Sequence, residues 1–387
     1  MSFPIFLPTS YDSQYSLLGA MAAQLRDALA RAGCRLVDEP DPSEAGAYIF
    51  FNYPDIEHRF VREIGAPGSK MAMLQIVVDH PYALDERVTD WLVARPNHRL
   101  VMPCLDSLHA MALRWPGIRH AHMPHAVTAR DVITHVAAPY AKREFDLVIA
   151  GSFASEAQLE RMATMMDPRT RAVADEIAGL LRASPSVTFE QAMDLALGAR
   201  SAMFPSWTQH AALWRYVTAR LNRLTRLDML DAAQGIRALV VGADSIAEHC
   251  TGTLTYGGAC AYEDVAARLA QGRVCLALGP TQFTHTFSER LLLGMAAGCA
   301  CVADDRWMIG RHFETSGGAR HLSVFPARDP GAARAAIDAA LSAPEESTAM
   351  AVRGQREVRS RHLWDHRLGF LTRVIGTAVT RDASIAA

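Results

Sequence analysis

The sequence has no apolar run as long as the roughly 18 residues that a membrane-spanning helix needs. Its first residues, MSFPIFLPTSYDSQ, lack the basic start and the long apolar stretch of a secretory signal peptide. The formal net charge of −2 creates no overall field that would recruit nucleic acid or an anionic membrane. We therefore expect a cytoplasmic protein with no integral membrane segment and no nucleic-acid partner.

Cysteine is scarce and badly spaced for cross-linking. The 7 cysteines are an odd number and include no CxxC pair, which argues against a disulfide framework and against a zinc ribbon. His120, His122 and His125 are possible metal ligands by residue type, but no other Cys/His group has a spacing that completes a site. We interpret residues 120–131 as a linker or cleft edge, and the sequence predicts no metal site.

The length of 387 residues favours two domains, and a composition that is 50% hydrophobic and 21% charged is sufficient for two cores. We expect an N-terminal Rossmann-like domain over residues 1–140 and a second such domain over residues 141–360. Residues 361–387 are expected to form a closing helix and tail that pack back towards the first domain. A cleft between domains is a common place for a small ligand.

Short apolar runs alternate with helical patterns in the first domain. Strands are expected at residues 4–9, 34–37, 47–52, 71–78 and 99–103, with a helix over residues 17–32. This alternation predicts an α/β fold with a doubly wound parallel sheet, which binds ligands beyond the carboxyl ends of its strands. The polar residues expected along that edge are Ser10, Asn52, Asp79, His80 and Asp106.

A second alternation begins with a buried strand over residues 145–150, and Gly151 and Ser152 follow it directly. A helix then opens near Ser155, so the segment has the outline of a phosphate-binding turn. It has neither the GxGxxG motif nor the lysine of a P-loop, and a tight strand-to-helix turn is the alternative. Helices are expected over residues 168–232, with a basic face that we interpret as solvated. Its members are Arg215, Arg220, Arg223 and Arg226.

Residues 283–305, FTHTFSERLLLGMAAGCACVADD, predict a loop, a buried helix, a glycine stop and a buried strand. Ser288 is a suitable N-cap, and Glu289 lies in the first turn, where the helix dipole favours an acid. The free N–H groups of a helix start bind phosphate, and Arg290 could neutralise an anion held there. The alternative is a core helix whose Arg290 pairs with a carboxylate.

Several segments of the second half together resemble the CgeB-like family of GT-B glycosyltransferases. They are FDLVIAGS from residue 145, ALVVG from residue 238, YGGACAYEDVAARLAQGRVCLAL from residue 256, FSERLLLGMAAGCACVADD from residue 287 and HLWDHRLGFL from residue 362. The resemblance covers about residues 144–372, and the first 140 residues are similar in architecture alone. It implies two Rossmann-like domains facing a cleft, an N-terminal acceptor domain and a C-terminal nucleotide-sugar donor domain.

The resemblance further implies a donor that is a nucleotide-diphosphate sugar, without another cofactor. Gly151 and Ser152 would leave room for the sugar and phosphates, and Tyr256 or Tyr262 would flank the base. The phosphate side of the site would consist of Thr286, Ser288 and Arg290, and Glu289 would be a candidate to hold the donor ribose. Because the helix start and Arg290 would stabilise the leaving diphosphate, no metal ion would be needed, and we interpret Asp304 and Asp305 as structural.

The acceptor is not identified by the sequence and could be a glycan, a lipid, a small molecule or a protein. Candidates for the base that takes its proton are Asp79, His80 and His285. Asp79 could instead cap a turn, and His285 could instead contact the donor sugar. Many GT-B proteins hold the donor ribose with a glutamate where this chain has Leu293. This difference keeps open a non-catalytic scaffold that binds a glycan or protein partner. A sugar-nucleotide epimerase is a further alternative, which would require acid/base carboxylates close to the anomeric carbon of the donor.

Overall fold

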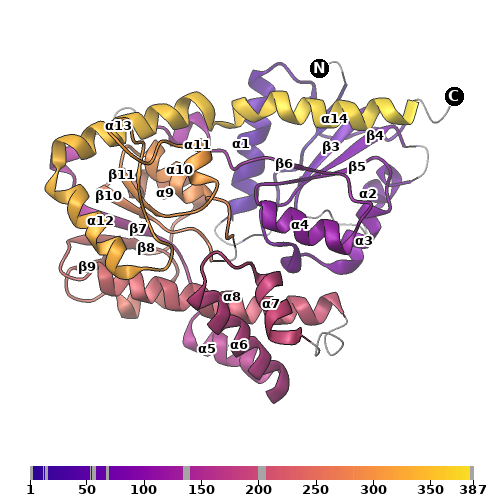
Figure 1. Ribbon diagram of the computed structural model, residues 1–387. Helices are drawn as coiled ribbons and strands as arrows, with labels where there is room; N and C mark the ends of the chain where they lie inside the picture. The colour runs from indigo at the N-terminus through magenta and orange to yellow at the C-terminus, as the bar shows by residue number, and fades with distance from the viewer. Residues whose placement is uncertain are drawn as a thin grey trace. The chain divides into compact units, whose positions relative to one another are not determined.

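The computed structural model of the chain describes residues 3–11, 13, 16–52, 54, 58–66, 69–133, 140–198, 206–281 and 283–383, and it consists of two compact units (Figure 1). The first unit contains residues 1–126 and 363–387, and the second contains residues 127–362. The structure describes the whole of residues 120–131, which we interpreted as a linker or cleft edge, and positions 134–139 after them lie outside the described residues.

The first unit is built on a six-stranded parallel sheet with the strand order β2-β1-β3-β4-β5-β6. Its strands are β1 (Ile5–Phe6), β2 (Leu36–Val37), β3 (Gly46–Phe51), β4 (Met71–Ile76), β5 (His98–Met102) and β6 (His120–His122). The central strands β3, β4 and β5 are buried along their whole length, as is typical of parallel strands covered on both faces.

Strand β6 corrects our interpretation of this region as a linker, because Leu100 to Met102 pair with His120 to His122. The strand has only three residues and its side chains are partly or fully exposed. An edge strand of this kind has no apolar run, so the hydrophobic pattern could not reveal it.

The helices of the first unit are α1 (Leu17–Arg31), α2 (Arg59–Ile64), α3 (Glu86–Val93), α4 (Leu105–Arg114) and α14 (Leu368–Ala383). Helix α14, from the far end of the chain, lies along β3, β4 and β5 (Figure 1). The turn before it is joined to α1, since Asp365 accepts a hydrogen bond of 2.8 Å from Arg31 and Trp364 donates one of 3.2 Å to Gln24. The C-terminal segment is therefore part of the first unit.

The second unit has its own six-stranded parallel sheet, with the strand order β12-β11-β10-β7-β8-β9. Its strands are β7 (Phe145–Ala150), β8 (Ala238–Val241), β9 (Leu254–Tyr256), β10 (Gly272–Ala277), β11 (Ala300–Asp304) and β12 (Ser323–Phe325). The order reverses direction between β7 and β10. Ligands of doubly wound sheets bind beyond the strand ends at such a point.

In the connection from β7 to β8, the described residues form the helices α5 (Glu156–Thr164), α6 (Pro168–Ala183), α7 (Phe189–Leu197) and α8 (Trp207–Ala232). They form a group in which α8 contacts α5 and α6 (Figure 1). The other helices of this unit are α9 (Val265–Leu269), α10 (Glu289–Ala296), α11 (Ile309–His312), α12 (Pro330–Ser342) and α13 (Pro344–Arg361). Of the helices that the structure describes, none is both long and apolar enough to cross a membrane.

Helix α10 packs unusually close to the sheet because of Gly294 in its middle. A Cβ atom at this position would lie 2.8 Å from Sγ of Cys275 and 3.0 Å from Sγ of Cys301, which are paired neighbours on β10 and β11. The last turn is held by side chains: Arg143 donates 3.1 Å to the carbonyl of Ala297, and Gln355 donates 2.8 Å to the carbonyl of Ala296. The start of α10 is thereby fixed over the carboxyl ends of β10 and β11.

Candidate functional site

The candidate site lies at the carboxyl ends of β7, β8 and β10 in the second unit. Gly151 and Gly242 end β7 and β8, and their backbones approach so closely that a Cβ at Gly242 would lie 1.8 Å from the carbonyl oxygen of Gly151. The N–H of Gly151 donates 2.9 Å to the carbonyl of Val241. The predicted turn after β7 therefore exists, and the close packing of the two backbones requires glycine at position 242, after β8.

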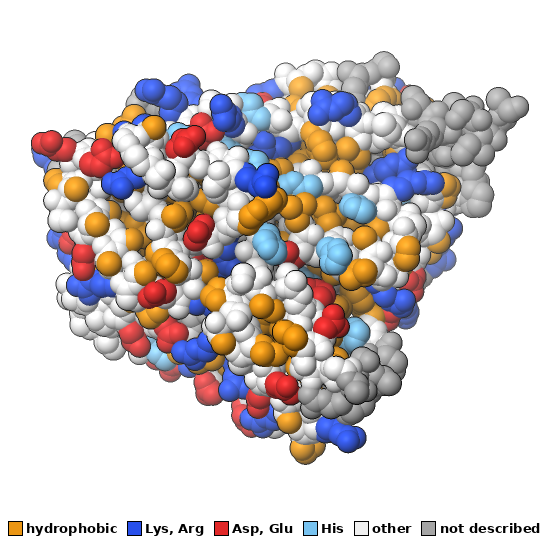
Figure 2. All heavy atoms as spheres, viewed as in Figure 1, with side chains coloured by type: hydrophobic (Ala, Val, Ile, Leu, Met, Phe, Trp, Pro, Cys, Tyr) orange, Lys and Arg blue, Asp and Glu red, His pale blue; other side chains and the backbone are white. Residues whose placement is uncertain are grey.

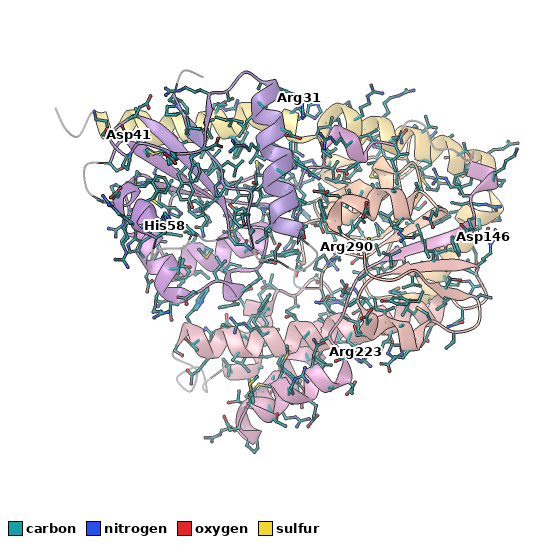
Figure 3. All side chains as sticks on the ribbon, turned by 180° about the vertical axis from the view of Figure 1, so that it is seen from behind. Arg31, Asp41, His58, Asp146, Arg223 and Arg290 are labelled. Atoms are coloured by element: carbon teal, nitrogen blue, oxygen red, sulfur yellow. The ribbon has the colours of Figure 1, made fainter. Side chains whose placement is uncertain are left out.

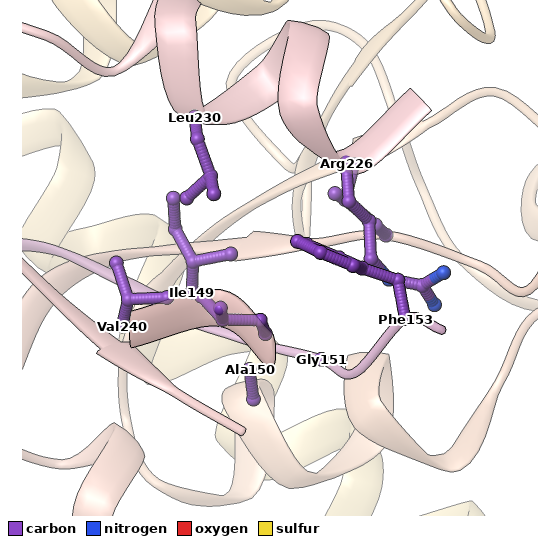
Figure 4. Close-up of a pocket in the computed structure, with 9 residues that line it drawn as sticks. Ile149, Ala150, Gly151, Phe153, Arg226, Leu230 and Val240 are labelled. Atoms are coloured by element: carbon purple, nitrogen blue, oxygen red, sulfur yellow. The ribbon is translucent and has the colours of Figure 1, made fainter. Parts of the chain in front are cut away.

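Arg226 on α8 lies directly against this turn. Only 8% of the residue is exposed, and a Cβ at Gly151 would lie 3.0 Å from its Nε. Together with Phe153 and Leu230 it lines a small, mainly apolar pocket at the end of β7 (Figure 4). This corrects the interpretation of α8 as a solvated basic face, since Arg223 is also buried.

The charge of Arg226 is poorly compensated. Nε is buried and, among the residues that the structure describes, has no hydrogen-bond partner, while Nη1 makes a long contact of 3.5 Å with the carbonyl of Asn222 in the same helix. Burial lowers the pKa of the guanidinium to about 9; the nearby Arg290 lowers it further, and Asp304 opposes the shift. A buried cation without an ion pair among the described residues is costly, and an anionic ligand would offset this cost.

The start of α10 supplies the second cation. Ser288 is the N-cap as predicted, but its hydroxyl makes no capping hydrogen bond within the described part of the chain, so the first N–H groups are not occupied by it. Arg290 follows at the second helical position, and its Nη1 is buried and finds no partner among the described residues. Among the described residues, no ion pair supports the alternative in which a carboxylate neutralises Arg290. Figure 3 shows Arg290 at the start of α10 and Arg223 on α8.

The loop between β10 and α10 is fastened to β11. Asp304 accepts 2.9 Å from the N–H of Gly279 and 2.8 Å from Nε of Arg306, and Arg306 donates 3.0 Å to the carbonyl of Phe283. This supports our interpretation of Asp304 as structural. No group of three or more His, Cys, Asp or Glu side chains suited to a metal ion occurs within the described ranges.

Two of the predicted donor contacts, Ser152 after β7 and Tyr256 at the end of β9, have structural partners. The hydroxyl of Ser152 accepts 3.1 Å from the N–H of Ala243, and the hydroxyl of Tyr256 donates to the carbonyl of Gly242 at 3.1 Å and lies 2.8 Å from Oδ1 of Asp244. Tyr262 is buried, and its hydroxyl is without a partner in the portion of the chain that is described. Burial, followed by the nearby Glu289, raises its pKa well above the usual value.

The loop residues before α10 differ in exposure. Thr286 is buried, and its hydroxyl makes a contact of 3.5 Å with the carbonyl of Phe287. His285 is partly exposed, and its ring lies edge-to-face on Trp307 with 6.4 Å between centroids. Of these two, His285 is the more accessible to a ligand.

Asp79 and His80 belong to the first unit, at the end of β4. Asp79 is exposed and accepts 2.8 Å from Nδ2 of Asn52, whose left-handed backbone (φ 55°) ends β3. His80 is 1% exposed, and burial lowers the pKa of its imidazole to about 3. Its Nδ1 accepts 3.3 Å from the N–H of Tyr82, so the ring caps a short turn.

The structure thus brings together Gly151, Ser152, Ser288 and Arg290 from the predicted set, and it adds Arg226, which the sequence analysis missed. The three-residue spacing of Arg223 and Arg226 could have indicated a shared inward face, but it is equally typical of a solvated one. On the face shown in Figure 2, basic and acidic side chains of the described residues are interspersed, without a one-sign patch.

Comparison with protein families gives one match. The model of a family described as "Glycosyl transferase-like" matches residues 223–373, which include Arg226, Arg290 and Asp304. None of the curated proteins matches the sequence. The chain is therefore similar to this family over residues 223–373, which is less than half of its length.

Solved structures agree in fold. Sucrose-phosphate synthase from Thermosynechococcus elongatus is similar with a TM-score of 0.50 at 13% identity, over 97% of this chain and 100% of the other. A DNA-modifying β-glucosyltransferase, studied with and without its substrate uridine diphosphoglucose, gives a TM-score of 0.54 at 10% identity, over 97% and 99%. Likeness at this level shows the fold alone: two parallel six-stranded sheets with surrounding helices, as in GT-B glycosyltransferases.

Proposed function

We propose that this chain transfers a sugar from a nucleotide-diphosphate sugar to an acceptor hydroxyl without a metal ion. The observation that carries the proposal is the pair of guanidinium groups of Arg226 and Arg290 at the end of β7 and the start of α10. Both have buried nitrogen atoms without a partner among the described residues. The family match over residues 223–373 supports the same activity, and the closer likeness to the CgeB-like family is part of the proposal.

Such a reaction breaks the bond between the anomeric carbon and the diphosphate, so negative charge grows on the leaving group. Arg226, Arg290 and the N–H groups that start α10 would stabilise this charge in a site with little water. Two fixed guanidinium groups are enough to balance a diphosphate, which is why we propose that a metal ion is unnecessary.

The residues that hold the rest of the donor also belong to the proposal. Leu293, where many GT-B proteins have a glutamate, is 1% exposed and lies in the core, so it cannot bind a ribose. Glu289 is partly exposed one turn earlier and is the candidate for that role. Tyr262 and Tyr256 remain the candidates that flank the base.

Among the proposed bases, Asp79 and His285 suit proton transfer better than His80. A histidine with a pKa of about 3 is a weak base near neutral pH, and the Nδ1 of His80 already accepts a hydrogen bond from the backbone. The carboxylate of Asp79 is exposed and oriented by Asn52. We propose Asp79 as the base and His285 as a contact of the donor sugar.

The test is a thermal-shift panel of UDP, GDP, CDP, dTDP and ADP, each with and without Mg²⁺. Binding to the folded state raises the melting temperature by mass action. We expect one diphosphate to raise it, equally with and without Mg²⁺, and Arg290→Ala to weaken the affinity about tenfold or more. Arg356→Ala, an exposed arginine on α13, is the matched control and is expected to bind normally.

The outcomes distinguish the alternatives. If no diphosphate binds, the proposal fails and a scaffold that binds a glycan or protein partner becomes the better account. If a nucleotide sugar binds and is converted to its epimer without release of the nucleotide, the chain is an epimerase. Slow hydrolysis of the donor with release of the diphosphate is the result expected of a transferase without its acceptor.

A further inference from the structure

Next to the guanidinium pair lies a second group of unsatisfied polar atoms, formed by Thr281 and Arg328. Thr281 follows β10 and is 4% exposed, yet its hydroxyl has no hydrogen-bond partner within the described residues. Arg328 follows β12, and its Nε and Nη1 are buried and likewise without a partner there. Nη2 of Arg328 makes a long contact of 3.4 Å with the carbonyl of Thr281, so the two residues are adjacent.

Arg328 is held in a conformation that is unfavourable for its residue type. Its backbone is left-handed, with φ of 64°, which costs about 1 kcal/mol or more for a side chain other than glycine. Burial lowers the pKa of its guanidinium to about 10; Arg306 adds to the shift and Asp304 opposes it. Backbone strain and a desolvated charge in the same residue are typical of functional sites.

The pair is connected to the proposed diphosphate site by direct contacts. The N–H of Thr281 donates 3.0 Å to Oδ1 of Asn222 on α8, and the carbonyl of Asn222 is the group that Nη1 of Arg226 contacts. Asp304 acts on the pKa of both Arg226 and Arg328, so both cations lie near it.

The charges at these strand ends are not all used by a diphosphate. Arg306 is neutralised by Asp304, with which it forms a buried ion pair. Arg226 and Arg290 match the charges of a diphosphate, as proposed above. The charge of Arg328 remains, beside a buried hydroxyl that can donate.

We propose that Thr281 and Arg328 form a separate oxyanion subsite, which takes a carboxylate or phosphate group of a substrate other than the donor diphosphate. This inference rests on the proposed function and narrows its substrate class. The group would belong either to an acidic sugar on the donor, such as a uronic acid, or to a phosphorylated acceptor. In both cases the guanidinium and the hydroxyl donate to the oxyanion, and no covalent step is involved.

The experiment compares dissociation constants by calorimetry for two donor pairs that differ only in a carboxylate, UDP-glucose with UDP-glucuronic acid and GDP-mannose with GDP-mannuronic acid. Glucose 6-phosphate is titrated separately into protein saturated with the diphosphate that binds. The variants are Thr281→Val, which keeps the shape, and Arg328→Asn, because asparagine tolerates a left-handed backbone. Melting temperatures establish that each variant is folded.

A donor-borne group is indicated if the acidic donor binds at least about tenfold more tightly than its neutral counterpart and if both variants abolish this difference without weakening the neutral donor. An acceptor-borne group is indicated if glucose 6-phosphate binds the unaltered protein and not the variants. The subsite proposal is overturned if, for each of these ligands, the unaltered protein and both variants have the same dissociation constant.

The failure of the proposed function is a separate result. If no nucleotide binds, the subsite is tested with inorganic phosphate and glucuronate alone by thermal shift. A shift that Arg328→Asn removes then supports the subsite on its own, and an unchanged or absent shift overturns it.

Discussion

Replacing Arg226 with methionine is expected to make the protein more stable and the proposed donor site weaker. The side chain lies in a mainly apolar pocket with Phe153 and Leu230, so a methionine stem fits the surroundings (Figure 4). The change removes a charge that has no ion pair within the described residues. Stability and binding should therefore move in opposite directions.

The expected gain in stability follows from the pKa. A guanidinium lowered from 12.5 to about 9 corresponds to about 5 kcal/mol of penalty on the charged form. The folded state bears this penalty at neutral pH, because a lowered pKa of a base means that folding disfavours its proton. The contacts that the guanidinium loses on substitution offset part of the gain from removing this penalty. Replacements of buried ions by apolar residues have stabilised other proteins by about 1–4 kcal/mol. We expect a gain within this range, at about 2–4 °C in Tm per kcal/mol.

The expected loss of affinity follows from the charge-assisted hydrogen bonds that Arg226 would donate to a diphosphate. Such bonds contribute about 1.5–3 kcal/mol, which corresponds to a loss of about 10- to 150-fold. The assay is a pair of measurements on one sample, the Tm without ligand and the dissociation constant of the diphosphate selected in the panel.

Arg223→Met is the matched control, one turn earlier on the same helix. Arg223 is also buried, but it donates 3.2 Å to the carbonyl of Ala154, lies 3.2 Å from Glu156 and stacks on Phe153. Its removal is expected to lower stability by about 1–2 kcal/mol and to leave the dissociation constant unchanged. The reasoning is refuted if Arg226→Met destabilises the protein as Arg223→Met does and binds the diphosphate normally.

Three further predictions concern stability. Asp131 is buried, and burial is the main cause that raises its pKa to about 6, so its charge destabilises the fold as the pH rises from about 4 through 6. Asp131→Asn can still accept the hydrogen bond from the N–H of Thr128. In urea titrations, this variant should raise the unfolding free energy by up to about 3 kcal/mol at pH 8 and leave it unchanged at pH 4. His80 and His98 are both buried, with pKa values of about 3. The unfolding free energy of the first unit should therefore fall by about 2 kcal/mol per histidine between pH 7 and pH 5, because the unfolded chain takes up the protons. In His98→Gln the fall should be about half as large, and an equal fall in the variant and the unaltered protein would show that His98 does not have this low pKa. Gly294→Ala should destabilise the protein by about 1–3 kcal/mol through the clash with Cys275 and Cys301. The double variant with Cys275→Ala should recover part of the loss in Tm. A higher Tm in Gly294→Ala, from the better helix propensity of alanine, would contradict the prediction and show that α10 can move away from the sheet.

The hydrophobic pattern by itself determined the buried central strands of both sheets. Strand β7 begins and ends at the residues expected, and the runs that predicted β3 and β4 are offset by at most two residues. These strands are buried on both faces, so their sequence must be apolar throughout and is recognised easily. The helix start at Ser288 was also local information, because a capping residue and an acid in the first turn are sequence signals.

Tertiary structure alone decided which charged side chains are buried. Arg215 and Arg226 are both arginines on α8, but Arg215 is exposed and Arg226 lies against Gly151. Their difference depends on which face of α8 meets the sheet, and that is set by β7 and the loop after it, about 75 residues earlier in the chain. The same holds for Thr281 and Arg328, which are brought together by strand order across β10, β11 and β12.

The protonation of a histidine likewise depends on tertiary structure and cannot be predicted from the sequence alone. The sequence offered His80 as a base because it follows a strand next to an aspartate, but the pKa of an imidazole depends on how much water surrounds it. Only the packing around β4 reveals that His80 is almost fully enclosed and that Asp79 is not. Residue types and their spacing therefore determined the fold and the end of the sheet where we propose that a ligand binds. Burial, which is a property of residues distant in sequence, decided which side chains there are candidates for the chemistry.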